Sequence, residues 1–217
     1  MKKAILIDFD GTITTDDTCK YLLFALIQQR PSRAPVSLFN FIKIYFLNDE
    51  YKKQSAKNKA IGNAISGLSE LKSKRALKKF KTMVSKIIRK TMLQKIKDSN
   101  INGIKVIIVT ASPTFAISNC LSEMEVAVIG TDFKTINSTY NGQVAGDFCY
   151  GKYKIKKIND WLEDKSIEYD FIEAWSDNIS DYPMMRMARK RFWIGNKKLK
   201  NKLNTLDPSG YYISDHD

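Results

Sequence analysis

The sequence predicts an α/β protein, a doubly wound parallel sheet that carries an inserted block of helices. Three short apolar runs, at residues 4–8, 106–112 and 170–177, end in polar side chains and have the pattern of buried parallel strands. Helical patterns at 115–124 and 154–164 lie between them, and this alternation is typical of such sheets. Functional sites in these sheets lie beyond the carboxyl ends of the strands.

The alternation stops over residues 15–95, where the pattern is helical and is broken only at prolines and glycines. We therefore predict a Rossmann-like core formed by residues 1–14 and 96–217, with residues 15–95 inserted as a helical cap. A chain of 217 residues, 43% of them hydrophobic, is long enough for both parts.

Two segments of the insertion have distinct patterns. Residues 36–47 are apolar except for a narrow polar stripe, which predicts a core helix of the cap. Residues 71–90 are basic and amphipathic, which predicts a solvated face. Residues 15–100 contain 19 Lys or Arg and 6 Asp or Glu, so that all of the net charge of +13 lies in this segment.

A hairpin is expected after the second strand. Residues 126–133 have a strand pattern, and Asn141-Gly142 is the usual signal for a tight turn between paired strands.

Several classes of site are disfavoured by composition. Cys19, Cys120 and Cys149 are odd in number and lack metal-ligand spacing, so neither a disulfide framework nor a zinc site is predicted. The single histidine, His216, lies near the end of the chain, which argues against Ser-His or Cys-His catalysis. No apolar run reaches the roughly 18 residues that span a bilayer, and no signal peptide precedes the first strand, so we expect a cytoplasmic protein.

Four carboxylates are expected at one edge of the sheet. Asp8 and Asp10 follow the first strand, and Asp177 and Asp181 follow the third. An Asp-x-Asp pair by itself is more often structural, but four like charges so close together repel unless a cation neutralises them. Magnesium, which prefers oxygen ligands, is the natural cation.

Small and hydroxyl residues stand beside these carboxylates. Gly11 lets the chain turn sharply, and Thr12 offers a hydroxyl or an N–H group. Thr110 ends the second strand, where its hydroxyl and the amides of Ala111 and Ser112 could bind a phosphoryl oxygen. Simple helix capping is the alternative for Thr110.

Four motifs together resemble those of the haloacid dehalogenase superfamily. They are DFDGT at 8–12, VTAS at 109–112, a lysine in CYGKYKIKKI at 149–158 and SDNISDYPMM at 176–185, in the order and spacing of that family. An insertion directly after the first motif resembles the C1 type of helical cap. The lysine motif is similar to that of the phosphoserine-phosphatase-like branch.

The resemblance implies a role for each motif residue. Asp8 would be the nucleophile that attacks phosphorus, and Asp10 would act as general acid and base. Asp8 and Asp177, with the main-chain carbonyl of Asp10, would hold Mg²⁺. Thr110 and a lysine would bind the phosphoryl oxygens, and Asp181 would either complete the acidic cluster or orient that lysine.

The choice of lysine rests on alignment with the motif. The motif selects Lys154, and Lys152 is the alternative. Lys156 and Lys157 are interpreted as part of a solvated helix face.

The resemblance therefore implies a Mg²⁺-dependent phosphatase that forms an aspartyl-phosphate intermediate. The basic cap favours an anionic phosphorylated substrate, with peripheral membrane contact as a further hypothesis. Phosphatidylglycerophosphate-type lipid phosphatases and phosphoserine phosphatases are both candidates, although the latter carry a Glu in the opening segment of the cap, where the nearest residue here is Asp17. Phosphoryl transfer to another acceptor uses the same residues.

A basic nucleic-acid-binding protein is the alternative from another class. No nucleic-acid motif is present, however, so nucleic acid is not expected as a partner.

Overall fold

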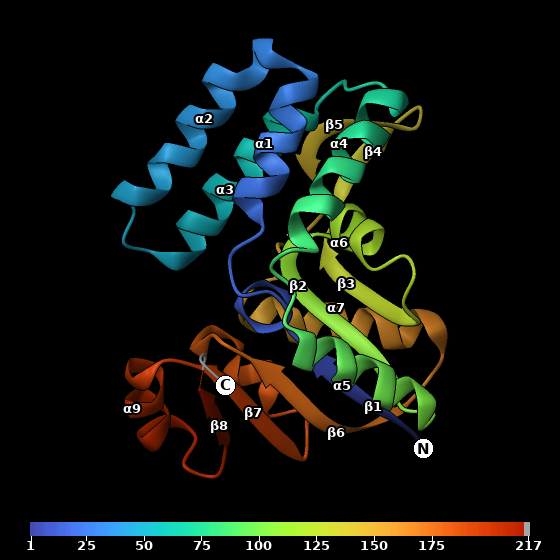
Figure 1. Cartoon of the computed structure of the whole chain (residues 1–217), viewed down its shortest axis with the longest axis vertical. Helices are drawn as coiled ribbons and strands as arrows, with labels where there is room; N and C mark the ends of the chain where they lie inside the picture. The colour runs from blue at the N-terminus through green and yellow to red at the C-terminus, as the bar shows by residue number, and fades with distance from the viewer. Residues whose placement is uncertain (215–217) are drawn as a thin grey trace.

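Strand β1 lies at the centre of a six-stranded parallel sheet in the order β3-β2-β1-β6-β7-β8 (Figure 1). The structure, a computed structural model, describes residues 1–214. The strands of this sheet are β1 (Lys2–Ile7), β2 (Lys105–Pro113), β3 (Val126–Thr131), β6 (Tyr169–Ser176), β7 (Lys190–Gly195) and β8 (Tyr211–Ser214). The predicted α/β class and doubly wound sheet are confirmed.

Helices cover both faces of the sheet, with α5 in front of it and α7 behind it in Figure 1. Successive side chains of a strand point to opposite faces, so Ile5 and Ile7 pack on one core and Ala4 and Leu6 on the other. This double burial explains why β1 reads as a continuous apolar run. The helices of the core are α5 (Lys90–Ile101), α6 (Thr114–Cys120), α7 (Lys152–Lys165), α8 (Tyr182–Met185) and α9 (Lys197–Leu206).

A layer of four helices lies beyond the carboxyl edge of the sheet (Figure 1). They are α1 (Cys19–Gln29), α2 (Ala34–Ile42), α3 (Glu50–Ile65) and α4 (Glu70–Val84), with short 3₁₀ turns at Pro31–Arg33 and Lys43–Phe46. The two connections to the core run side by side, because the Thr15 amide donates to the Ile87 carbonyl at 2.9 Å. Residue 95, the predicted end of the cap, falls inside α5, and the domain limits stay a prediction.

Helix α4 is amphipathic in the expected sense. Ala76, Phe80 and Val84 are fully buried against the rest of the protein, and its lysines point outward. The basic segment therefore has a solvated face, as its pattern predicted.

Helix α2 differs from its prediction. Residues 36–47 were expected to form a core helix, but the apolar side of α2 and of the turn after it faces outward. We call this side the outer apolar face; its exposed members are Val36, Leu38, Phe39, Ile42, Tyr45 and Phe46. The prediction is wrong because α2 packs mainly on α3, so only one narrow side of it is covered.

The hairpin also differs from its prediction. Strand β3 joins the main sheet, and the hairpin consists of β4 (Phe133–Ile136) and β5 (Thr139–Val144). Its turn is at Asn137-Ser138, both with positive φ angles of 47° and 62°. Gly142 lies within β5 instead, where a Cβ on the facing Gly62 of α3 would come within 2.1 Å of its carbonyl oxygen. The Asn-Gly pair thus serves close packing between the hairpin and the cap, not a turn.

The cysteines are free and buried, and burial raises the pKa of Cys120 and of Cys149 to about 12. Neither a disulfide nor a reactive thiol is indicated.

His216 lies outside the described residues. Among residues 1–214, no helix is both long enough and apolar enough to cross a bilayer.

Candidate active site

The register of three strands brings the predicted residues to one edge. Ile7 pairs with Ile108 of β2 and with Trp175 of β6, and the Asp8 amide donates to the Trp175 carbonyl at 2.9 Å. The residues that follow these positions therefore leave the sheet together. This is why Asp8, Thr110 and Asp177 meet although they are distant in sequence.

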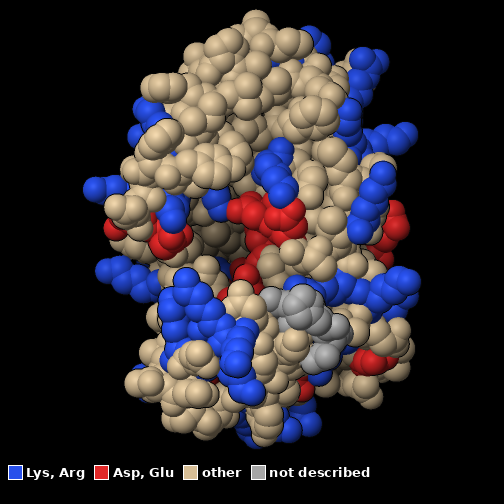
Figure 2. Space-filling view, turned by 60° about the vertical axis from the view of Figure 1, so that its left-hand side comes forward, with Lys and Arg blue, Asp and Glu red and all other residues tan. Residues whose placement is uncertain are grey.

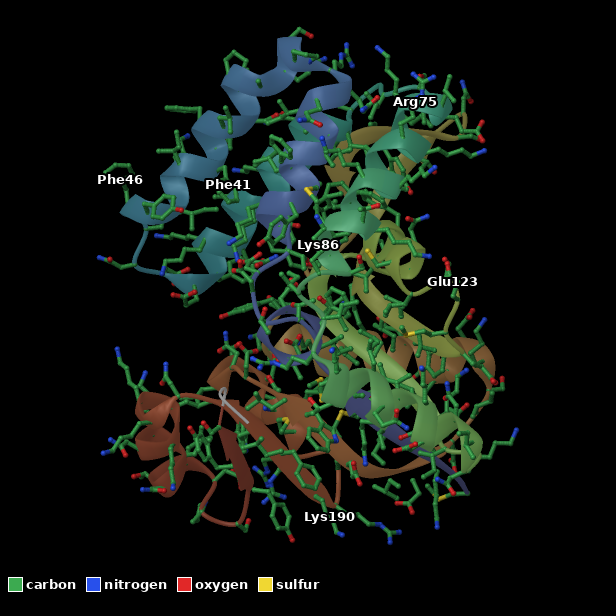
Figure 3. All side chains as sticks on the ribbon, in the orientation of Figure 1. Phe41, Phe46, Arg75, Lys86, Glu123 and Lys190 are labelled. Carbon is green, nitrogen blue, oxygen red and sulfur yellow. The ribbon has the colours of Figure 1, made fainter. Side chains whose placement is uncertain are left out.

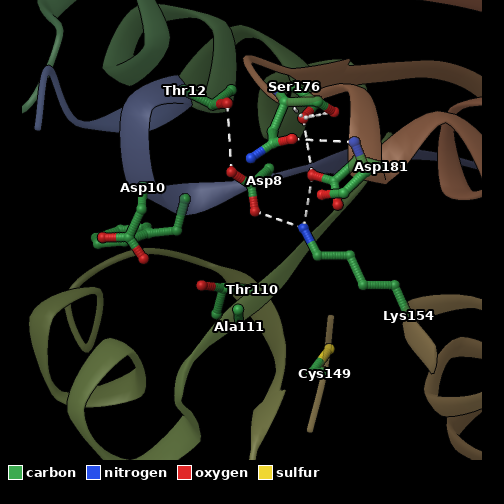
Figure 4. A network of polar contacts seen from close by, with 12 residues as sticks. Asp8, Asp10, Thr12, Thr110, Ala111, Cys149, Lys154, Ser176 and Asp181 are labelled. Carbon is green, nitrogen blue, oxygen red and sulfur yellow. Dashed lines mark hydrogen bonds and ion pairs between the residues drawn. The ribbon is translucent and has the colours of Figure 1, made fainter. Parts of the chain in front are cut away.

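Lys154 is the centre of a buried ionic network (Figure 4). Its Nζ lies 2.6 Å from Asp8 Oδ1 and 2.7 Å from Asp181 Oδ2, and the side chain is 2% exposed. The Ser176 hydroxyl donates to the same oxygen of Asp181 at 2.7 Å. Lys152, the alternative, is exposed and lies over the Tyr153 ring. The structure thus places Lys154, not Lys152, against Asp8.

Thr12 joins the carboxylates of two strands. Its hydroxyl lies 3.4 Å from Asp8 Oδ2 and 3.3 Å from Asp177 Oδ1. The chain reaches this position through Gly11, which has φ +79° and leaves no room for a side chain, because a Cβ there would lie 2.1 Å from Asp177 Oδ2. The glycine is therefore required by both conformation and space.

Three donors fix the carboxylate of Asp10. Its Oδ1 accepts from the amide of Thr18 at 2.7 Å and from the Thr18 hydroxyl at 2.6 Å, and its Oδ2 accepts from the Ser112 hydroxyl at 2.6 Å. Thr18 was not predicted, since a threonine before a helix reads as an ordinary cap. Ser112 was predicted to offer its amide to phosphate, but here that amide donates to Thr110 Oγ1 at 3.0 Å.

Of the other two predicted phosphate ligands on β2, one lines the cavity and one lies behind its wall. Thr110 is fully buried, and Ala111 lines the cavity wall. The Ala111 carbonyl accepts hydrogen bonds from Gln54 of α3 and from Thr131. This carbonyl therefore connects the core edge to the cap.

The charges of the site do not balance. Burial raises the pKa of Asp8 well above its usual range, Lys154 opposes this, and Asp181 and Asp177 add to it. Burial and then repulsion by Asp181 raise the pKa of Asp177 to about 7. Burial alone would lower the pKa of Lys154, but Asp181 and Asp8 outweigh it and raise that pKa. One lysine thus faces three carboxylates, an arrangement that favours a further cation.

The donor set fits magnesium. Asp8 and Asp177 present carboxylate oxygens on the two sides of Thr12. Hard oxygen donors in small number are what Mg²⁺ takes from proteins, the rest of its ligands being water and substrate. Within the part of the chain that the structure describes, no group of three acidic, histidine or cysteine side chains is arranged to hold a metal by itself.

A cavity of about 350 Å³ separates these residues from the cap. Figure 2 shows it as a hollow between the two parts of the molecule, with acidic residues at its wall. The cap lines it mainly with α3, through Lys53, Gln54, Lys57 and Asn58. Lys57 forms an ion pair with Asp17 across the cavity edge.

The cap residues of the cavity were missed by sequence reasoning. Lys57 is one of many lysines in a basic segment, and nothing in its local pattern sets it apart. Burial would lower the pKa of Lys57, but Asp17 outweighs it and the pKa is raised. The helical repeat of α3, which buries Gln54 and Asn58 on the same side, is the one signal that could have pointed to this face.

Solved structures share this fold. A protein of unknown function from Bordetella pertussis Tohama I is 16% identical with a TM-score of 0.82, and the match covers 99% of each chain. A phospho-aspartyl intermediate analogue of phosphoserine phosphatase is 17% identical with a TM-score of 0.57, over 93% of this chain and 90% of the other. Cytosolic 5'-nucleotidase IIIB bound to cytidine is 15% identical with a TM-score of 0.71, over 99% of this chain and 80% of the other.

Sequence comparison identifies the family. No curated protein sequence matches the chain. The profile of the haloacid dehalogenase-like hydrolases, however, matches residues 5–186, which include all four motifs and the insertion. The chain therefore belongs to the haloacid dehalogenase-like hydrolase family.

Proposed function

We propose that this protein is a Mg²⁺-dependent phosphomonoesterase that uses Asp8 as its nucleophile. The observation that carries the proposal is the position of Asp8 at the floor of the cavity, with one oxygen on Lys154 and the other on Thr12. Both neighbours keep the carboxylate oriented toward the space where a phosphate ester would sit. Such fixed placement is the main requirement of phosphoryl transfer.

In the first step an oxygen of Asp8 attacks phosphorus. A bond forms between this oxygen and phosphorus while the bond from phosphorus to the ester oxygen breaks, which leaves an aspartyl phosphate and a departing alkoxide. In the second step water attacks the same phosphorus, the bond to Asp8 breaks, and inorganic phosphate leaves. Lys154 neutralises part of the negative charge in both steps.

Asp10 is suited to move the proton in each step. Burial and the nearby charge of Asp17 raise its pKa, while hydrogen bonds from Ser112 and Thr18 lower it, with a net rise. A raised pKa favours a protonated Asp10 that can give its proton to the alkoxide. The resulting carboxylate then takes a proton from the attacking water.

Asp8, Asp177 and the Asp10 carbonyl would hold the metal. Bound Mg²⁺ would supply positive charge that offsets the phosphoryl oxygens and the surplus of carboxylates. Asp181 acts through Lys154, which it holds beside Asp8.

The cavity favours a small phosphorylated substrate. Its cap wall carries both signs of charge, Lys53 and Lys57 beside Asp17 and Glu50. An anionic or zwitterionic group next to the phosphate would find partners there.

The test is phosphate release from a panel of phosphate monoesters, with wild type and Asp8→Asn, with Mg²⁺ or with EDTA. The panel contains p-nitrophenyl phosphate, phosphoserine, sugar phosphates, nucleotides and phosphatidylglycerophosphate. We expect turnover by wild type with Mg²⁺, and loss of it in Asp8→Asn and in EDTA. Acid quenching followed by peptide mass spectrometry should find a phosphorylated peptide that contains Asp8.

The matched control is Asp164→Asn, at an exposed aspartate that does not line the cavity. It should behave as wild type. Turnover that survives in Asp8→Asn, or a phosphoryl group on another residue, would contradict the proposed nucleophile. Turnover that persists in EDTA would contradict the metal.

A further inference from the structure

Helix α2 and the turn after it expose large apolar side chains and bury a polar one, the opposite of a usual surface helix. Ser37 is fully buried and its hydroxyl has no hydrogen-bond partner among the described residues. Phe46 is 82% exposed, Tyr45 80% and Phe39 61%. Figure 3 shows Phe41 between α2 and α3, whereas Phe46 projects away from the end of the cap. A helix and turn that bury a serine and expose Phe39, Tyr45 and Phe46 are expected to have a partner on their outer side.

The charged residues on helix α2 and on the turn after it are all positive, and the nearest acidic residues along the chain, Asp49 and Glu50, come after the turn. Residues 18–48 contain four basic residues and no Asp or Glu. Arg33 lies at the start of α2, and Lys43 Nζ lies 4.3 Å from the centre of the Phe39 ring on the face itself. In Figure 2 the surface of the cap above the hollow is free of acidic residues and has basic ones toward its edges. Aromatic and aliphatic side chains bordered by Lys and Arg are typical of surfaces that lie in a lipid headgroup layer.

The outer apolar face also borders the active-site cavity. Ile44 lines the cavity, whereas the next two residues, Tyr45 and Phe46, belong to the outer apolar face. One short turn, Lys43–Phe46, thus connects the two. A surface bound by this face would lie next to the mouth of the cavity.

We propose that the outer apolar face binds the surface of a bilayer that contains anionic lipids. Phe39, Tyr45 and Phe46 enter the headgroup layer, and Arg33 and Lys43 contact lipid phosphates. The binding needs no catalysis, so it stands apart from the proposed phosphatase function.

A second copy of this chain fits the outer apolar face less well than an anionic bilayer does. A symmetric dimer through this face would place Arg33 and Lys43 against an identical face that has no acidic residue among its own members. The opposite charge that a partner must supply is present in an anionic bilayer.

The test is co-sedimentation of the full chain with vesicles. One set contains equal parts of phosphatidylcholine and phosphatidylglycerol, and the other contains phosphatidylcholine alone. We expect wild type to bind the anionic vesicles, to bind the neutral ones much less, and to be released by salt. The double variant Phe39→Ser/Phe46→Ser should lose at least about tenfold in affinity, because two large apolar side chains no longer leave water.

The matched control is Ile101→Ser/Ile136→Ser. These two residues are 82% and 61% exposed, the same fractions as Phe46 and Phe39, and lie outside the outer apolar face. Their loss should leave vesicle binding unchanged. Turnover of p-nitrophenyl phosphate without vesicles should be equal in all three proteins, whatever its level, which separates this inference from the phosphatase proposal.

Three results would overturn the proposal. They are no sedimentation of wild type with anionic vesicles, an equal loss of binding in the control variant, and a wild-type dimer in analytical ultracentrifugation that Phe39→Ser/Phe46→Ser converts to monomer. The last result would assign the face to a second copy.

Discussion

The two walls of the cavity are built in different ways. On the sheet side, Asp8 and Lys154 are buried, Asp10 is half-buried, and each of the three is held by two or more partners. On the cap side, Lys57 is held through a single ion pair with Asp17, and the helices nearby leave a broad apolar surface uncovered. From this difference we propose that the sheet would fix the chemistry, whereas the cap would select the substrate. The predictions below test this division, beginning with the largest effect.

Asp10→Asn tests the sheet wall most directly. We expect kcat for alkyl phosphates to fall by about 10²–10⁴-fold, because the amide cannot give a proton to the leaving oxygen. The loss should be much smaller for p-nitrophenyl phosphate, whose leaving group needs little protonation. Steady-state kinetics on both substrates measure this contrast, and equal losses would argue against an acid role for Asp10.

Lys154→Met tests whether the buried network is essential to the fold as well as to the reaction. Removal of one partner leaves buried carboxylates uncompensated, so the free energy of unfolding should fall by about 3 kcal/mol. Urea unfolding measures this change. Lys152→Met, at the exposed lysine of the same helix turn, should stay within about 0.5 kcal/mol of wild type. Similar losses in both variants would mean that helix α7, not the network, is being disturbed.

Two phenylalanines of the cap, one buried and one exposed, test whether the outer apolar face is uncovered in solution. Phe80 is fully buried and Phe46 is 82% exposed. We expect Phe80→Ala to lower the free energy of unfolding by about 3–5 kcal/mol. Phe46→Ala should change it by less than about 0.5 kcal/mol. A large loss for Phe46→Ala would show that the outer apolar face is covered within the folded chain in solution.

Lys57→Gln tests the cap wall. Because Lys57 lines the cavity and touches none of the reacting groups, we expect KM for anionic substrates to rise about tenfold and kcat to stay nearly constant. Lys59→Gln, at an exposed lysine of the same helix, is the control and should change neither constant. A fall in kcat with constant KM would place Lys57 in the chemistry and weaken the division between the two walls.

The strands of the core could be predicted from sequence because each has a local apolar pattern, and because parallel pairing fixes where their ends lie. A buried parallel strand must be apolar on both faces, so β1, β2 and β6 were each visible as short apolar runs. Parallel register then requires the residues after them to meet, which is why Asp8, Thr110 and Asp177 were predicted together. Thr18 and Ser112 were missed as partners of Asp10, because a hydroxyl near a helix start has many equivalent uses.

The cap could be predicted only as a set of helices. The pattern of residues 36–47 fits a buried helix and a helix with an outward apolar side equally well, since periodicity does not say which side has a neighbour. In the same way, Asn141-Gly142 has the composition of a turn but serves the close approach of α3 to the hairpin.

By itself the sequence determined the class of fold, the insertion and the carboxylates of the site, because apolar runs and motif spacing specify strands and their ends. Only the tertiary structure decided that Lys154, not Lys152, reaches Asp8, that α3 provides the opposite wall, and that α2 presents its apolar side to the outside. These features depend on how helices are rotated against their neighbours. That rotation is set by packing between segments far apart in the chain, which no local pattern records.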